Sequence, residues 1–167
     1  MRKIKIPVRY LPFSLSVKDK QKQKQMLLHS KKLYKKGKYY TRKKIPSYKS
    51  KKSHHINTAK RIYNIDKVLP NKELSIKTGC SINALKKIVN KGEGAYYSSG
   101  SRPNQTPQSW GIARLASALT SGKAAAIDYD ILKNGCNHNK KAFILAKKSK
   151  RKYGFGHSQT LKRSISV

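Results

Sequence analysis

Few residues of this sequence have the types and spacing that catalysis or metal binding requires. Cys136 and His138 can supply two zinc ligands, and Cys80, His54 or His55 can complete such a site, but the spacing matches no familiar zinc module. The 6 acidic residues are dispersed and form no obvious carboxylate pair. The glycine-rich stretch GEGAYYSSGS lacks the GK[ST] ending of a phosphate-binding loop. We therefore predict a protein that is not an enzyme, with no cofactor, no metal and no small-molecule substrate.

Binding chemistry is better supported, first in the stretch ELSIKTGCSINALKKIV, which has the pattern of a helix-turn-helix unit. Leu74 and Ser75 are the apolar and small residues of its first helix, and Gly79 lies where the turn needs a left-handed backbone. Ser81 can cap the second helix, whose inward residues are Ile82, Leu85 and Ile88. The outward residues have side chains that contact base edges and phosphates: Asn83, Lys86, Lys87, Asn90 and the adjoining Lys91. Such units also serve purely as packing modules, so both roles remain open.

Tyrosines interleaved with cations mark a second candidate binding segment near the N-terminus. The stretch YYTRKKIPSYKSKKS carries Arg42, Lys43 and Lys44 between tyrosines that can stack on bases. This is the composition of an arm that lies on phosphates or on an acidic protein surface. The alternative is that the tyrosines pack beneath the core.

Two further segments complete the candidate binding residues. The nearly uncharged stretch from residue 92 to residue 110 contains Tyr96, Tyr97 and Arg102. Its paired tyrosines either contact a partner or pack against their own core. Close to the C-terminus, KKSKRK resembles a nuclear-localisation or polyanion-binding run and contributes Lys150, Arg151 and Lys152.

The elements that must position these residues are mainly α-helical. A helix is predicted between Ser16 as N-cap and Gly37 as terminator, and further helices begin after Ser53, Asn71 and Thr106. The glycines of residues 92–100 predict a loop, with Trp110 anchoring its far end in the core. A last core helix, KAAAIDYDILKN, ends at Gly135, and the opening IKIPVRYLPFSL predicts a sheet edge or free strand.

The resulting fold class is a small helical core with a helix-turn-helix-like unit, flanked by extended basic N- and C-terminal arms. Residues 1–52 form the N-terminal arm with one amphipathic helix, residues 53–136 the core, and residues 137–167 the basic tail. Flexibility is expected at YGFGH within that tail.

The net charge of +34, from 40 Lys and Arg against 6 Asp and Glu, is the strongest constraint on partners. A compact chain with this charge repels itself, so nucleic acid or an acidic protein surface is the expected partner. The sequence contains no run of 18 apolar residues, so no membrane span is predicted. Two cysteines make no disulfide framework, which favours a reducing compartment.

Three stretches carry a resemblance to a known family: KKLYKKGKYYTRKK, TGCSINALKKIV and GAYYSSGSRPNQTPQSWGIARLASALTSGKAAAIDY. Over residues 6–136 the sequence resembles an uncharacterised family of small basic proteins of nucleocytoplasmic large DNA viruses, the phycodnavirus and mimivirus-like giant viruses. The resemblance implies a viral origin. It implies no activity and no catalytic residue.

Charge and resemblance together predict a structural protein of a virus particle, assembled in the host cytoplasm or nucleus. It would be a minor capsid or internal virion component whose basic arms bind capsid proteins of the same virus or packaged double-stranded DNA. The alternative is a helix-turn-helix-type DNA-binding protein for genome packaging or regulation.

Overall fold

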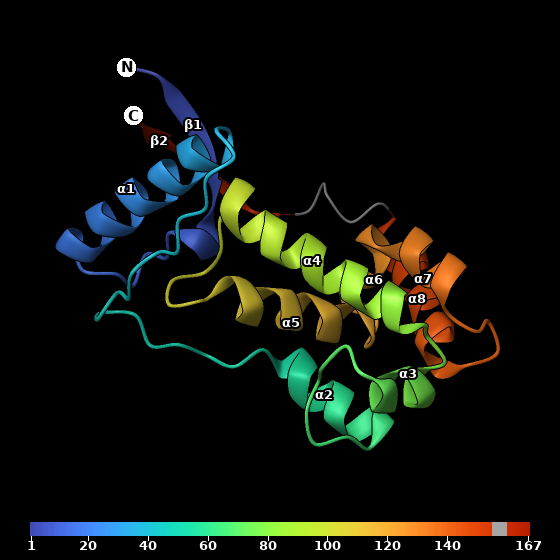
Figure 1. Cartoon of the computed structure of the whole chain (residues 1–167). Coiled ribbons are helices and arrows are strands. Elements are labelled where there is room, and N and C mark those ends of the chain that lie inside the picture. Colours follow the sequence, from blue (N-terminus) through green and yellow to red (C-terminus); the bar gives the residue numbers. More distant parts are fainter. Residues whose placement is uncertain (155–159) are drawn as a thin grey trace. The chain divides into compact units, whose positions relative to one another are not determined.

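The computed structural model describes residues 1–154 and 160–167 and is mainly helical (Figure 1). The described residues contain eight α-helices, a two-stranded sheet and a short 3-10 helix at Val8–Tyr10. The predicted mainly α class with a helical core is therefore confirmed. The strands are β1 (Lys3–Pro7) and β2 (Lys162–Ser166), and the helices are α1 (Val17–Tyr34), α2 (His54–Tyr63), α3 (Lys72–Thr78), α4 (Ile82–Ser98), α5 (Pro107–Ala118), α6 (Lys123–Ile127), α7 (Tyr129–Gly135) and α8 (Lys141–Tyr153).

The chain divides into two compact units, which differ from the three parts predicted from charge. The first unit comprises Met1–Lys51, Gly94–Pro107 and Gln159–Val167, and the second comprises Lys52–Glu93 and Gln108–Ser158. Charge alone cannot predict this division, because each unit is assembled from segments far apart in the sequence.

In the first unit, both ends of the described chain pair with each other. Strands β1 and β2 are antiparallel, with Ile4 opposite Ile165. The expected sheet edge is thus present at the start of the chain. Helix α1 begins where predicted, because the Ser16 side chain accepts a hydrogen bond from the Asp19 N–H at 3.2 Å. The buried apolar residues of this unit are Ile6, Tyr10, Leu11, Leu15, Met26, Leu27, Ile45 and Tyr96.

In the second unit, α3 and α4 form the predicted helix-turn-helix unit (Figure 1). The Asn71 side chain caps α3 by accepting from the Leu74 N–H at 2.9 Å. Gly79 has the predicted left-handed backbone, with φ of 74°. The Ser81 Oγ accepts from the Ala84 N–H at 3.1 Å at the start of α4. The inward residues Leu74, Leu85 and Ile88 belong to a core that α5 to α8 complete with Leu115, Leu119, Leu132, Ala142 and Phe143.

The predicted loop at residues 92–100 is wrong for its first part, because α4 continues to Ser98. Gly92 serves helix packing: a Cβ there would lie 2.6 Å from the Cα of Gly111 on α5. The gain from this close approach of α4 and α5 outweighs the low helix propensity of glycine. Trp110 is half-buried on α5 and is outside the core cluster, in contrast to the prediction.

The predicted C-terminal tail is largely part of the second unit. Helix α8 buries Ala142, Phe143 and Ala146, and the Ser149 Oγ donates to the Gly122 carbonyl at 2.7 Å. The other face of α8 is rich in lysine, so the charge of this segment predicts a solvated tail although one face of the helix is apolar. Of the YGFGH segment, the last three residues lie outside the described part of the chain.

Candidate polyanion-binding surfaces

The first unit is almost free of negative charge. It contains 18 Lys and Arg in residues 1–51, Arg102, and the pair Lys162 and Arg163, against one acid, Asp19. That acid is buried, and its Oδ2 accepts a hydrogen bond from the Ser47 N–H at 2.8 Å. Hydrogen bonds from the side chain and backbone of Ser47 lower the pKa of Asp19. The one carboxylate of the unit therefore already has its hydrogen-bond partner within the unit. Any neutralising charge for the exposed lysines must therefore come largely from outside this unit.

The candidate residues of the first unit fall into two groups. Lys43, Lys44 and Arg102 are exposed, and Tyr97 is half-buried. Arg42 and Tyr96 are buried, with exposed fractions of 8% and 0%. The prediction that these two side chains contact a partner is therefore wrong, and they pack against their own unit.

Arg42 joins the basic segment that follows α1 to the C-terminal end of α4. Its guanidinium lies 3.7 Å from the centroid of the Tyr96 ring, a cation–π contact. It donates to the Tyr96 carbonyl at 2.9 Å, to Ser30 Oγ at 3.0 Å and to Ser101 Oγ at 2.8 Å. Its backbone N–H donates to the Tyr96 hydroxyl at 2.8 Å. Burial lowers the pKa of Arg42, but an arginine still remains protonated.

Replacing Arg42 with Met is expected to loosen residues 38–48, because buried acceptors on Ser30, Tyr96 and Ser101 lose their donor. Losing hydrogen bonds from a charged group costs about 2–3 kcal/mol. Hydrogen exchange followed by mass spectrometry measures the protection of residues 38–48 directly. The exposed neighbour Lys43→Met removes the same charge and is the control. Equal protection in both variants would contradict the structural role of Arg42.

Three hydrogen bonds of Asn104 and the burial of Ile45 also hold the same segment. Asn104, in a left-handed conformation with φ of 62°, accepts from the Ile45 N–H and donates to the carbonyls of Ile45 and Tyr48. Ile45 is fully buried. The predicted N-terminal arm is thus folded onto its own unit, while most of its lysine side chains remain exposed.

In the second unit, the outward face of α4 is as predicted: Asn83, Lys86, Lys87 and Asn90 are exposed. Asn83 and Lys87 also line a cleft of about 270 Å³, whose opposite wall on α7 carries Asp130 and Asn134. A recognition helix places its N-terminal residues in the major groove. The carboxylate of Asp130 beside those residues is unfavourable for approach to phosphates.

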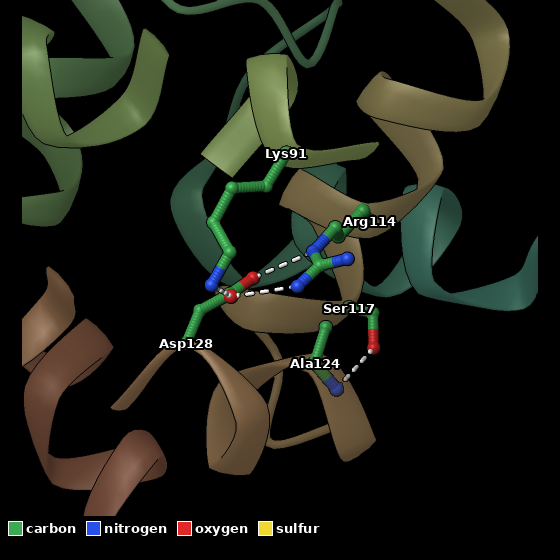
Figure 2. Close-up of polar contacts among 5 residues, drawn as sticks. All are labelled: Lys91, Arg114, Ser117, Ala124 and Asp128. Carbon is green, nitrogen blue, oxygen red and sulfur yellow. Dashed lines mark hydrogen bonds and ion pairs between the residues drawn. The ribbon is translucent and has the colours of Figure 1, made fainter. Parts of the chain in front are cut away.

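Lys91, which is predicted to bind a partner, also has a structural contact within the second unit. Figure 2 shows Lys91 of α4 and Arg114 of α5 converging on Asp128, which separates α6 from α7. The Asp128 side chain is fully buried, and the Lys91 Nζ lies 2.8 Å from its Oδ1. Arg114 donates to both carboxylate oxygens, at 2.8 and 2.7 Å. The single helix predicted across this segment is therefore broken at a buried carboxylate, and these contacts link four helices.

The basic run of α8 is partly involved in packing. Lys150 is half-buried, with its Nζ 5.4 Å from the centroid of the Tyr129 ring. Arg151 and Lys152 are exposed, and Lys152 lies 5.1 Å from the Tyr153 ring centroid. These residues remain candidates for binding, presented by a helix instead of a tail.

The two cysteines form a disulfide, in contrast to the expectation that two cysteines make no disulfide framework and indicate a reducing compartment. Cys80 follows α3 and Cys136 follows α7, and a short antiparallel bridge places them opposite each other. The flanking hydrogen bonds run from the Ser81 N–H to the Gly135 carbonyl and from the Asn137 N–H to the Gly79 carbonyl. The two cysteines are 56 residues apart in the sequence, so local sequence patterns could not predict this pairing.

Within the described residues, no group of three or more His, Cys, Asp or Glu is placed to hold a metal ion.

His55 is a titratable group held in its neutral form. Its Nδ1 lies 3.1 Å from the Thr120 Oγ1, which itself donates to the Ala116 carbonyl. The hydroxyl oxygen is therefore the acceptor, and the proton of neutral His55 is on Nδ1. Burial lowers the pKa of His55, and the adjacent His54 lowers it further.

The folded protein is expected to lose stability as the pH falls below about 6.5, the ordinary histidine value. Above that value His55 is neutral in both states. Below it, the unfolded chain binds a proton that folded His55 resists, so acid favours unfolding. Thermal unfolding followed by Trp110 fluorescence between about pH 7.5 and 5.5 measures this decline. His55→Gln should flatten it and His54→Gln should preserve most of it; a decline unchanged in His55→Gln would contradict the assignment.

The described residues define the class of the protein: a strongly basic, mainly helical protein with a helix-turn-helix unit and no helix suited by length and apolarity to crossing a membrane. The chain belongs to the DUF5824 family, a family of unknown function, whose model matches residues 7–139. No curated protein matches the chain, and neither does any solved structure.

Proposed function

We propose that this protein is a non-enzymatic structural component of a large DNA virus particle, in which its basic surface binds acidic capsid proteins at the inner face of the shell. The observation that carries the proposal is the charge of the first unit, with 21 Lys and Arg against one buried acid. Such a surface is self-repelling until an anionic partner covers it. The viral origin rests on the resemblance of residues 6–136.

The Cys80–Cys136 disulfide favours a role in the virus particle over a role as an intracellular regulator. Disulfides persist in oxidising surroundings, including virus particles, and are rare where cellular thiols are kept reduced. Cys80 and Cys136 are both buried, with exposed fractions of 1% and 7%. A protein that leaves the cell within a particle can retain this bond.

Quantitative mass spectrometry of purified particles tests the proposal. Particles are opened, treated with nuclease and washed, and the ratio of this chain to the main capsid protein is measured before and after. An unchanged ratio in the DNA-free shells is the expected result. Absence of the chain from particles, or its complete release with the genome, would overturn the proposal.

A second candidate function is duplex DNA binding through α4, favoured by the exposed Lys86 and Lys87 on the helix-turn-helix unit. The variant Lys86→Glu/Lys87→Glu should then abolish duplex binding while the fold survives. The control, Lys3→Glu/Lys5→Glu, makes the same charge change on exposed lysines of β1. A DNA-binding helix requires a much larger loss in the first variant, whereas general phosphate attraction predicts similar losses and a steep salt dependence in both.

A further inference from the structure

We propose that Tyr34, Tyr39 and Tyr97 form a platform on which unpaired bases of single-stranded nucleic acid stack, while surrounding lysines bind the phosphates. This inference goes beyond the particle role and does not depend on it, because it rests on an aromatic cluster of the first unit. We call these three residues the tyrosine platform.

The rings of the tyrosine platform are close together and accessible. Tyr34 and Tyr97 are parallel within 6°, with ring centroids 6.4 Å apart. The Tyr39 ring lies 5.0 Å from Tyr97 and 6.2 Å from Tyr34. Tyr39 is 71% exposed and Tyr34 is 37% exposed. Burial of large aromatic side chains usually stabilises a folded protein. A cluster of three tyrosines at the solvent-accessible surface therefore needs a further explanation.

Local backbone structure holds the platform in place. Gly37, with φ of 71°, follows α1 in a left-handed conformation, and the Lys38 N–H donates to the Leu33 carbonyl. This hydrogen-bond pattern is a Schellman turn, which ends the helix and reverses the chain. The reversal brings Tyr39 back beside Tyr34, confirming the terminating role predicted for Gly37.

The third ring is fixed from the other side of the cluster. Ser30 of α1 donates from its Oγ to the Tyr97 carbonyl at 3.3 Å. Tyr97 also makes an edge-to-face contact with the buried Tyr96, with ring centroids 5.2 Å apart. The platform is therefore preorganised, which lowers the entropy that a ligand must pay on binding.

The charge around the platform selects an anionic ligand. Exposed lysines precede and follow Tyr34 at the end of α1 and in its Schellman turn: Lys31, Lys32, Lys35, Lys36 and Lys38. Cations that follow a backbone, combined with aromatic rings that receive bases, are the features of single-strand binding sites. A duplex offers its phosphates but keeps its bases paired, and an acidic peptide offers charge without a planar ring. Single-stranded nucleic acid is the ligand that uses both parts of the surface.

Fluorescence anisotropy of the full chain with labelled oligothymidine of about 12 nucleotides tests the inference, since single-strand sites cover roughly 4–16 nucleotides. An abasic strand of equal length has the same phosphates without bases and isolates stacking from charge. The variant is Tyr39→Ala, because this ring is the most exposed. Phe13→Ala removes another exposed aromatic ring of the same unit, 68% exposed, and is the matched control.

Tyr39→Ala is expected to weaken oligothymidine binding about five- to tenfold, at the low end for loss of one base stack. Binding of the abasic strand should be unchanged, Phe13→Ala should bind as the unmodified chain does, and Tyr39→Phe should restore binding. Circular dichroism verifies the fold of each variant. Equal affinity for the two strands, or an equal effect of Tyr39→Ala on both, would overturn the inference. So would equally tight binding of polyglutamate or duplex DNA that ignores Tyr39.

Discussion

Reduction of the Cys80–Cys136 disulfide is expected to lower the free energy of unfolding of the second unit by about 4 kcal/mol. The bond closes a chain segment with a sequence separation of 56 residues. The loss of loop entropy in the unfolded chain gives this magnitude for a loop of such length. Urea unfolding followed by Trp110 fluorescence, with and without reductant, measures the change, because the only tryptophan lies in this unit.

The double variant Cys80→Ala/Cys136→Ala separates the bond from other effects of the reductant. It should unfold like the reduced protein and should not respond to reductant. Alanine suits both positions because both side chains are buried. Free thiols in the untreated protein, detected by alkylation and mass spectrometry, would contradict the pairing. An unfolding midpoint that ignores reductant would contradict the stabilising role.

Asp128→Asn is expected to destabilise the second unit by about 3–5 kcal/mol, the usual cost of breaking a buried ion pair from one side. The amide preserves the shape but leaves the guanidinium of Arg114, which is 19% exposed, without its charged partner. Lys91, which is 48% exposed, recovers part of its hydration. Urea unfolding with the Trp110 signal again supplies the measurement.

Asp130→Asn is the matched control for Asp128→Asn, because it makes the same chemical change two residues away on an exposed side chain. It is expected to alter the free energy of unfolding by no more than about 0.5 kcal/mol. Similar losses in both variants would show that net charge, and not the buried contacts of Asp128, governs stability.

The helix ends and the helix-turn-helix unit could be predicted because their signals are local. A cap such as Asn71 acts on a backbone N–H three residues away, and Gly79 sets its own backbone angle. Such interactions leave a mark within a few residues of sequence. The exposure of Lys86 and Lys87 followed in the same way from helical spacing.

The features that sequence analysis missed depend on contacts between distant segments. Arg42 has the same local surroundings as the exposed Lys43, but it contacts Ser30 of α1 and the end of α4, which lies more than 50 residues later. The Cys80–Cys136 bond and the break at Asp128 have the same origin. Among binding residues, Tyr34 was missed because its partners are Tyr39 across a turn and Tyr97 on another helix. Its aromatic type among lysines was the available signal.

The contact of Gly92 with Gly111 limits which sequences can adopt this fold. A Cβ on Gly92 would meet the Cα of Gly111, and a Cβ on Gly111 would lie 2.7 Å from the carbonyl oxygen of Val89. Backbone atoms cannot rotate aside as a flexible side chain does, so even one added methyl group would force the two helices apart. No compensating change in a neighbouring side chain can restore that room. The packing of α4 against α5 therefore requires glycine at both positions.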